Sequence, residues 1–363
     1  MFGLSSGPLE AALFDLDGLL VDSEPLWHKA EVLVLNQYGV PLTPEMCRQT
    51  KGRYVTEAVL HWHAIYPWDS PGIDAVVTEI LDELAVLVDT WLELKPGALE
   101  AVEACKNRAL KLAVASSSPL RIIEAALLRF NLQDEFMAVC SAENEKQGKP
   151  DPAVFLTAAR LLGAEPATCV VFEDSLAGIR AAKTAGMLCV AVPEERAGPS
   201  AAVVAPGAAV APAAVADVVL RSLEELDDRA WNRLQIRPGT RVRVISEHRG
   251  SKRSPIRVAP GDVLSVGERD DEWPAFATVT KSDGGQGWVP MRILTRTGSP
   301  GSDVSTVRSQ FTYDTTELDV DPGSELRVVE TDLGSGWLWC SSGSGTEAWV
   351  PVRCIEPIAL KAR

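Results

Sequence analysis

The chain has 363 residues, of which 46% are hydrophobic and 23% charged, a composition typical of packed globular domains and not of disordered or fibrous proteins. Its 50 acidic residues outnumber 35 basic ones, and the net charge of −15 disfavours nucleic acid and anionic membranes as partners. No apolar run has the length of a membrane span, and the first ten residues do not resemble a secretory signal, so we expect a cytoplasmic protein. Seven scattered cysteines without C-x-x-C spacing argue against a disulfide framework or a zinc site.

Short apolar runs alternate with helical patterns across residues 1–230. The runs LEAALFDLD, KLAVASSS, EFMAVCSAE, ATCVVFED and MLCVAVPE predict strands, and segments such as PLRIIEAALLRF predict helices between them. This alternation indicates an α/β domain with a Rossmann-like parallel sheet. Residues 24–94, between the first two strands, are mostly amphipathic and exceed one crossover in length, so they predict an inserted helical cap. Residues 195–217 are rich in Ala, Pro and Val and predict a loop.

The last third of the chain repeats itself. GWVPMRIL at 287–294 returns as AWVPVRCI at 348–355, and APGDVLSV returns as DPGSELRV after nearly the same interval. Both copies hold short alternating strand patterns without a helical pattern, so we expect two small all-β barrels at 237–296 and 304–357. Residues 237–363 carry 16 Lys and Arg against 17 Asp and Glu. The acidity of the chain therefore belongs to the α/β part.

Two aspartates follow the first predicted strand. Asp15 and Asp17 lie at i and i+2 in LFDLDGLLVDSE, where both can face a crevice beyond the carboxyl edge of the sheet. An aspartate can attack phosphorus as a nucleophile, and a second carboxyl can act first as an acid and then as a base. Gly18 permits a tight turn in which backbone N–H groups can bind phosphate oxygens. Taken alone, such a pair of aspartates is more often a solvated turn.

Four motifs, in this order, resemble those of the haloacid dehalogenase-like hydrolase superfamily. The first is D-x-D-G, which begins at Asp15, and the second is a Ser at the end of the second strand, Ser116. The third is Lys149 in GKPDP, and the fourth is an acidic pair after a strand, Glu173 and Asp174. Each motif alone has an ordinary interpretation as a turn, a helix start or a loop. Their joint order and placement argue against a chance match.

The resemblance implies a role for each of these residues. Asp15 is the nucleophile, Asp17 is the acid and base, and Lys149 stabilises the transition state. The implied phosphate-binding residues are Asp17, Gly18, Ser116, Ser117 and Lys149. The implied cofactor is Mg²⁺, which suits carboxylate oxygens beside a phosphate. Its implied ligands are Asp15, Asp17 through the backbone carbonyl, Glu173 and Asp174.

The substrate implied by the resemblance is a small phosphorylated metabolite. Residues 9–195, with segments such as DGLLVDSEPLWHKAE and GKPDPAVFL, are similar to hexitol phosphatases and 2-deoxyglucose-6-phosphate phosphatases. In those enzymes a helical cap selects the leaving group. Within the cap, Lys51, Gly52 and Arg53 either reach the substrate or form an ordinary charged helix start. One alternative is a sugar phosphomutase of the β-phosphoglucomutase type, although those enzymes carry a His where this chain has Trp27. Another is a phosphatase of nucleotide or flavin phosphates.

The two repeats resemble SH3 domains. In the second copy, ELDVDPGSEL corresponds to the acidic turn, GWLW to the central tryptophan and AWVPVR to the closing strand. SH3 domains grip proline-rich peptides on aromatic side chains, so the resemblance implies a protein partner. The usual closing tyrosine is replaced by Arg292 or Arg353, which leaves packing or assembly as an equal alternative. A scaffold without activity is the opposing hypothesis, and the intact set of catalytic residues disfavours it.

Overall fold

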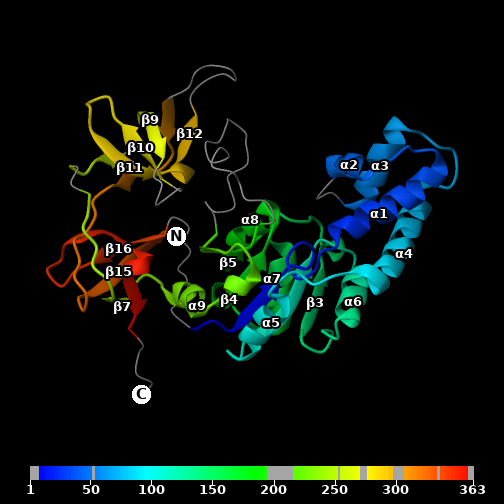
Figure 1. The fold of residues 1–363 in the computed structure, drawn as a ribbon, viewed down its shortest axis with the longest axis horizontal. Coiled ribbons are helices and arrows are strands. Elements are labelled where there is room, and N and C mark those ends of the chain that lie inside the picture. The colour runs from blue at the N-terminus through cyan, green and yellow to red at the C-terminus, as the bar shows by residue number, and fades with distance from the viewer. Residues whose placement is uncertain are drawn as a thin grey trace. The chain divides into compact units, whose positions relative to one another are not determined.

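The computed structural model describes residues 8–50, 54–193, 216–251, 254–269, 276–296, 306–332 and 336–358 (Figure 1). Contacts group them into two compact units. One unit holds residues 9–187 and 222–224, and the other holds the described parts of 188–221 and 225–363. Among the described helices, none combines the length and the apolar character that crossing a bilayer requires. The seven cysteines are buried and form no disulfide.

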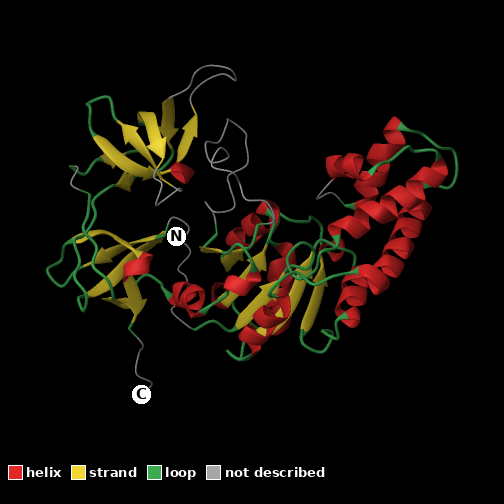
Figure 2. Ribbon diagram, in the orientation of Figure 1, coloured by secondary structure: helices red, strands yellow, loops and turns green. Residues whose placement is uncertain are grey.

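A six-stranded sheet forms the α/β part (Figure 2). Its strand order is β3-β2-β1-β4-β5-β6, and the pairs β1–β2, β1–β4, β2–β3 and β5–β6 are parallel. The strands are β1 (Ala11–Phe14), β2 (Lys111–Ser116), β3 (Ala138–Ser141), β4 (Cys169–Glu173), β5 (Leu188–Ala191) and β6 (Val218–Val219). Each of the five apolar runs named above contains one of the first five strands. The expected α/β class with a parallel sheet is confirmed.

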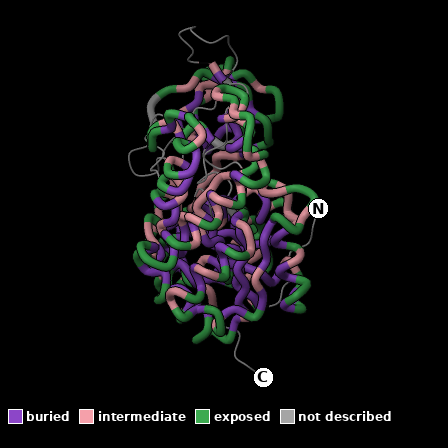
Figure 3. The backbone as a smooth tube through the Cα atoms, turned by 90° about the vertical axis from the view of Figure 1, so that its right-hand side faces the viewer, coloured by how far each residue is buried: buried purple, intermediate pink, exposed green. Residues whose placement is uncertain are grey.

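The strands are apolar because helices cover the sheet. β1 and β4 are buried along their whole length, and β2 is buried after its first residue. Figure 3 colours the backbone by burial, with buried stretches in purple. Continuous apolar strands of this kind are typical of parallel sheets with helices on both faces. The helices are α5 (Ala98–Lys106), α6 (Leu120–Arg129), α7 (Ala153–Leu162), α8 (Leu176–Thr184) and α9 (Asp228–Gln235). α5 and α7 contact β2, α6 contacts β3, and α8 contacts β4.

Among the described residues between β1 and α5, the structure has four α-helices. They are α1 (Glu24–Leu35), α2 (Pro44–Cys47), α3 (Val55–Ile65) and α4 (Ile73–Trp91), and they occupy the segment in which the cap is expected. α4 packs against α1 and α3 through a buried stripe at helical spacing: Val76, Ile80, Leu84, Leu87 and Val88. Arg129 of α6 donates hydrogen bonds to the carbonyls of Leu92 and Thr90, at 2.9 and 3.1 Å. These bonds tie the end of α4 to the core.

The two repeats form short antiparallel strands. The first repeat holds β7 (Arg241–Val244), β8 (Arg257–Val258), β9 (Val263–Arg269), β10 (Phe276–Thr280), β11 (Gln286–Pro290) and β12 (Leu294–Arg296). The second holds β13 (Thr306–Ser309), β14 (Tyr313–Asp314), β15 (Glu325–Asp332), β16 (Trp337–Ser341), β17 (Glu347–Pro351) and β18 (Ile355–Pro357). These antiparallel sheets confirm the expected all-β class of this part of the chain.

The repeats exchange their first strands. One sheet has the order β11-β10-β9-β13-β12, and the other has the order β17-β16-β15-β7-β18. β8 of the first repeat also pairs with β14 of the second. The segments 237–296 and 304–357 therefore hold one copy of the repeat each, but neither holds a complete sheet. β7 and β13 both alternate buried and more exposed residues, and each buries its valines (Val242 and Val244 in β7, Val307 in β13) in the sheet of the other repeat.

Candidate functional site

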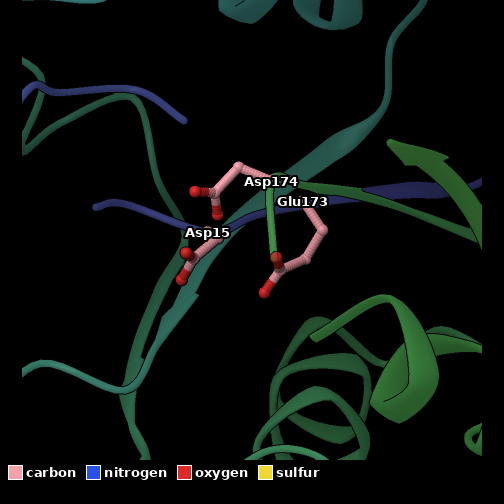
Figure 4. A group of neighbouring side chains, drawn as sticks. All are labelled: Asp15, Glu173 and Asp174. Atoms are coloured by element: carbon pink, nitrogen blue, oxygen red, sulfur yellow. The ribbon is translucent and has the colours of Figure 1, made fainter. Parts of the chain in front are cut away.

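The carboxyl ends of β1 and β4 bring three acidic side chains together. Asp15 directly follows β1, Glu173 ends β4, and Asp174 follows it; the two strands are neighbours in the sheet. The strand order reverses between them, and such a point is where open α/β sheets bind ligands. Figure 4 shows the three carboxylates gathered at one point, and their ligand atoms lie within 4.8 Å of one another. Among the described residues, no other group of His, Cys, Asp and Glu has this arrangement.

Lys149 forms ion pairs with two of these carboxylates. Its Nζ lies 2.8 Å from Oδ1 of Asp15 and 2.6 Å from Oε1 of Glu173. The Lys149 side chain is only 3% exposed. Burial lowers the pKa of Lys149, but Asp15 and Glu173 together raise it above its ordinary value. The lysine therefore stays charged in the buried site.

The acidic cluster carries more negative charge than Lys149 offsets. Burial raises the pKa of Asp15 to about 7, with Lys149 opposing the shift and Glu173 and Asp17 adding to it. Burial also raises the pKa of Asp174 to about 9, and repulsion from Glu173 and Asp15 adds to that shift. A cation with a preference for hard oxygen ligands would supply the missing positive charge. The donor set, carboxylate oxygens that lie within 4.8 Å of one another, fits such an ion.

Three serine hydroxyls hold Asp17 beside this cluster. Ser118 Oγ donates to Oδ2 of Asp17 at 2.7 Å, and Ser116 Oγ donates to the same oxygen at 3.2 Å. Ser23 Oγ donates to the other carboxylate oxygen, Oδ1. The backbone N–H of Ser118 donates to Ser116 Oγ at 3.1 Å, which closes a compact turn after β2. These bonds fix the orientation of the Asp17 carboxylate.

Both oxygens of Glu173 are engaged by the protein. Oε1 accepts from Lys149, and Oε2 accepts from the N–H and the hydroxyl of Ser175, at 2.7 and 3.0 Å. Ser175 Oγ in turn accepts from the N–H of Gly178 at 3.0 Å and caps α8. A Cβ at Gly178 would lie 1.6 Å from Oε1 of Glu173, so only glycine leaves room for this carboxylate. Glu173 therefore orients Lys149.

Gly18 leaves room for Asp174 in the same way. Its φ of +79° lies in the left-handed region, where glycine is favoured. A Cβ at this position would lie 2.2 Å from Oδ2 of Asp174. The glycine of the D-x-D-G motif is thus required both for the turn and for the close approach of the Asp174 carboxylate.

Tyr54 of the cap segment reaches the loop that carries Lys149. It immediately precedes α3, and a Cβ at Gly148 would lie 1.9 Å from the Tyr54 hydroxyl oxygen. Burial raises the pKa of Tyr54, Glu57 adds to the shift, and the charge of Lys149 opposes it. The Tyr54 hydroxyl is therefore close to the loop that carries Lys149. Residues 51–53, the expected substrate-contacting tip, lie outside the described residues.

The structure brings most of the predicted site residues together. Asp15, Lys149, Glu173 and Asp174 form one cluster, and Asp17 and Ser116 lie beside it. Ser117 is exposed, and the serine that reaches Asp17 is Ser118. Side chains alternate along a strand and the extended chain that follows it, so residues two apart share a side. This alternation could have identified Ser118 in the run SSSP, whereas Ser23 and Ser175 carry no comparable signal.

Comparisons with known proteins assign two parts of the chain to protein families. The model of the haloacid dehalogenase-like hydrolase family matches residues 9–186, and that of the variant SH3 domain matches residues 241–295. Hexitol phosphatase B of Escherichia coli (strain K12) is 41% identical over 218 residues, which cover 60% of this chain and 93% of that protein. β-Phosphoglucomutase of Bacillus subtilis (strain 168) is 31% identical over 190 residues, which cover 51% and 83%.

A solved structure shares the same fold. The crystal structure of CbbY from Rhodobacter sphaeroides in complex with phosphate is 27% identical, covers 60% of this chain and 96% of that chain, and superposes with a TM-score of 0.51. The match to the variant SH3 domain confirms the resemblance stated for the first repeat. The hydrolase-family match spans all four motifs, from Asp15 to Asp174. The chain therefore belongs to the haloacid dehalogenase-like hydrolase family, and its activity is that of a phosphatase.

Proposed function

We propose that the chain is a Mg²⁺-dependent phosphomonoester hydrolase that acts on small sugar or sugar-alcohol phosphates through an aspartyl-phosphate intermediate. The observation that carries this proposal is the cluster of Asp15, Glu173 and Asp174, with Lys149 paired to two of its members. The relative named hexitol phosphatase B supports the class of substrate. The SH3-like repeats serve partner binding or assembly.

Mg²⁺ is the cofactor of this proposal. Asp15, Asp174 and the backbone carbonyl of Asp17 would hold the ion, and Glu173 would support the site through Lys149. When bound, the ion supplies positive charge between an anionic site and an anionic ester. The raised pKa values of Asp15 and Asp174 support this assignment, because they show that the cluster does not carry its full negative charge readily without a cation.

Asp15 forms the covalent intermediate. Lys149 engages Oδ1 of Asp15, so we assign the attack on phosphorus to Oδ2. The P–O bond to the alcohol breaks as the new P–O bond forms, and Asp17 gives its proton to the leaving alcohol. Lys149 stabilises the negative charge that develops on the phosphoryl oxygens.

Hydrolysis of the intermediate regenerates the site. Asp17 takes a proton from water, the water oxygen attacks phosphorus, and the bond from Asp15 to phosphorus breaks with release of phosphate. Ser118 and Ser23 keep Asp17 oriented through both steps. Ser116 makes the longest of the three contacts to Asp17, at 3.2 Å, and we assign it to the phosphoryl group when substrate is bound.

The cap segment contacts the leaving group. Tyr54 lies against Gly148, next to the lysine that faces the phosphoryl group, so its hydroxyl is placed to meet the sugar end of the substrate. Lys51, Gly52 and Arg53 remain candidates for the same role. Closure of such a segment would exclude water from the intermediate until the alcohol has left.

The phosphomutase alternative differs at one position in α1. Trp27 stands where the resemblance places a histidine in β-phosphoglucomutases, and His28 next to it lies 3.7 Å from Glu24 of the same helix. A mutase must return its phosphoryl group to sugar instead of water. Incubation with β-glucose 1-phosphate separates the two: free phosphate supports the hydrolase, and glucose 6-phosphate without phosphate supports the mutase.

A phosphate-release screen tests the proposal. The full chain is incubated with hexose, hexitol, nucleotide and flavin phosphates, each with Mg²⁺ and with EDTA. We expect release from hexose or hexitol phosphates and only with Mg²⁺. A preference for nucleotide or flavin phosphates would contradict the substrate class, and unchanged release in EDTA would contradict the cofactor.

The Asp15→Asn variant tests the nucleophile. It keeps the size of the side chain and removes its charge, so we expect release to fall roughly 10⁴-fold or more. Asp22→Asn is the matched control, because Asp22 is 41% exposed and lies outside the acidic cluster. Circular dichroism of both variants checks the fold. Wild-type release from a folded Asp15→Asn variant would refute the assignment.

A further inference from the structure

One buried carboxyl group of the cap segment has no part in the site described above. Glu31 is 8% exposed, and the other buried residues of α1 are all apolar. Its Oε2 atom is buried, and no hydrogen bond reaches it from the described part of the chain. Burial raises the pKa of Glu31 to about 7, and a hydrogen bond with the Cys47 side chain opposes the shift. A buried polar atom without a partner costs free energy, so this carboxyl points to a ligand that supplies a donor.

Glu31 lies on a face of α1 that begins beside the acidic cluster. The helix starts directly after Ser23, whose hydroxyl donates to Asp17, and it continues for 12 residues (Figure 1). Glu24, His28 and Glu31 follow one another at spacings of four and three residues, so they share one side of the helix. At 1.5 Å per residue, Glu31 lies about 10 Å along the axis from Glu24. The carboxyl is thus about two turns beyond the end of the helix that contacts Asp17.

The chain returns from Glu31 to the core through α2. Cys47 of α2 lies beside Glu31, and their side chains form a hydrogen bond. Tyr54, further along the chain, lies against Gly148 of the loop that carries Lys149. The cap segment therefore meets the core just before α1 and again just before α3, and Glu31 lies between these two contacts. A substrate whose phosphoryl group faces Lys149 would extend toward this part of the cap.

The two ends of such a substrate would meet groups of opposite charge. Lys149 is a buried cation and suits the phosphoryl end. Glu31 is an acid, and its carboxylate accepts hydrogen bonds from hydroxyl groups, of which sugars and sugar alcohols carry several. A second phosphate at the far end would be repelled by this carboxylate. Glu31 therefore favours an uncharged leaving group with many hydroxyls.

We propose that Glu31 is a specificity-determining residue whose Oε2 accepts a hydrogen bond from a leaving-group hydroxyl far from the phosphate. The inference rests on the proposed phosphatase function and deepens it, because it names a residue that recognises the sugar or sugar alcohol. The substrate hydroxyl supplies the donor that Oε2 lacks within the described residues. An ester that is too short to reach Glu31 gains nothing from this residue.

Two substrates of different length test the inference on the full chain. Sorbitol 6-phosphate carries hydroxyls along its whole carbon chain, whereas 2-hydroxyethyl phosphate is too short to reach Glu31. Glu31→Leu removes the carboxyl and keeps the position apolar, so the variant should remain folded. We expect it to lower kcat/KM for sorbitol 6-phosphate about 10- to 100-fold and to change kcat/KM for 2-hydroxyethyl phosphate by less than about twofold. Glu31→Gln keeps an acceptor oxygen and should lose less than Glu31→Leu.

Glu45→Leu is the matched control. Glu45 is an exposed glutamate of α2, so this variant should leave kcat/KM unchanged for both esters. Thermal unfolding checks the fold of all three variants. Equal losses on the two esters would show that Glu31 only supports the fold and would overturn the inference, as would unchanged kinetics with sorbitol 6-phosphate. No release from either ester by the wild-type chain would instead contradict the phosphatase function on which the inference rests.

Discussion

The parallel sheet and the paired repeats differ in how their strands find partners. In the sheet, three neighbouring strands end at polar residues: Asp15 follows β1, Ser116 ends β2 and Glu173 ends β4. The pairs β1–β2 and β1–β4 are both parallel, and helices cover their apolar strands. In the repeats, β7 and β13 have equivalent patterns and occupy each other's sheets. The parallel sheet is built within one domain, whereas each sheet of the repeats is completed by a strand from the other repeat.

This difference decides what each region can build. The proposed active site needs Asp15 and Asp174 at neighbouring strand ends, so its chemistry depends on the parallel pairing of β1 and β4. In the repeats, each sheet takes one strand from the other copy, and the exchange forms a cavity from residues of both copies. The catalytic region is therefore expected to withstand loss of the repeats, whereas neither repeat is expected to withstand loss of the other.

The largest effect is expected from removing the second repeat. A chain that ends at residue 303 keeps β7 without its partners β15 and β18, and keeps β9 without β13. Loss of these partners leaves edge strands unpaired and exposes the core. We therefore expect the first repeat to unfold completely. Limited proteolysis and nuclear magnetic resonance spectra of the truncated chain measure this. Native-like signals from residues 237–296 would show that the exchange is dispensable.

Removing residues 237–363 provides the matched control. This deletion takes away both repeats and leaves the six-stranded sheet with all four motifs. We expect phosphate release to stay within about twofold of the full chain, because none of the described contacts of the acidic cluster comes from the repeats. Loss of release from a truncated chain that is still folded would place the repeats in the active site.

The next largest effect is expected at Lys149. Lys149→Met removes the positive charge that pairs with Asp15 and Glu173, and we expect phosphate release to fall about 10²–10³-fold. Lys146→Met is the matched control, since Lys146 lies on the same loop and is exposed. Steady-state kinetics should show the loss in kcat. Equal kinetics of the two variants would mean that Lys149 only stabilises the fold.

The sequence predicts the catalytic part well because its chemistry is tied to strand ends. Apolar runs locate the strands, and the polar residues just beyond Phe14 and Phe172 then share one edge of a parallel sheet. The sequence predicts less about which neighbours support those residues. Whether Ser23 reaches Asp17 depends on a turn between them, and whether Glu173 faces Lys149 or a metal depends on side-chain orientation.

The exchange in the repeats could not be predicted from the sequence. The repeat period gives two copies of one strand pattern, but the alternation in RVRV at 241–244 and in TVRS at 306–309 does not say which of the two sheets each strand joins. Contacts between the two repeats, such as His248 Nε2 with Oε2 of Glu317, join residues far apart in the chain. Only the three-dimensional pairing shows that they meet. For the same reason, the sequence does not predict the cavity that residues of both repeats line.

A smaller effect is expected where the cap segment meets the core. Gly148→Ala places a Cβ 1.9 Å from the Tyr54 hydroxyl oxygen, so the tyrosine must move away from the loop of Lys149. We expect kcat/KM to fall about tenfold without unfolding. Gly72→Ala is the matched control, because no atom lies within 4 Å of its Cβ position. If Gly148→Ala keeps full activity on sugar phosphates, Tyr54 has no part in selecting them.

The smallest effect is a dependence of stability on pH that Mg²⁺ alters. The folded pKa values of Asp15 and Asp174, about 7 and about 9, exceed the ordinary value of 3.8, so the folded metal-free chain binds these protons more tightly than the unfolded chain. Its stability therefore falls as the pH rises from about 4 through 9. Mg²⁺ binds the deprotonated carboxylates, so we expect the rise in Tm that Mg²⁺ causes to grow from pH 6 to pH 9, by several degrees.

Two variants separate the acidic cluster from other buried carboxyls in this experiment. Asp174→Asn should remove most of the Mg²⁺-induced rise in Tm at pH 9, because it removes a proposed ligand. Glu31→Gln should keep that rise, since burial also raises the pKa of Glu31 to about 7 but Glu31 lies in α1, outside the cluster. Differential scanning calorimetry with Mg²⁺ and with EDTA measures both. A Mg²⁺ effect that is independent of pH, or equal in the two variants, would place the ion elsewhere and would leave the sheet edge without its proposed cofactor.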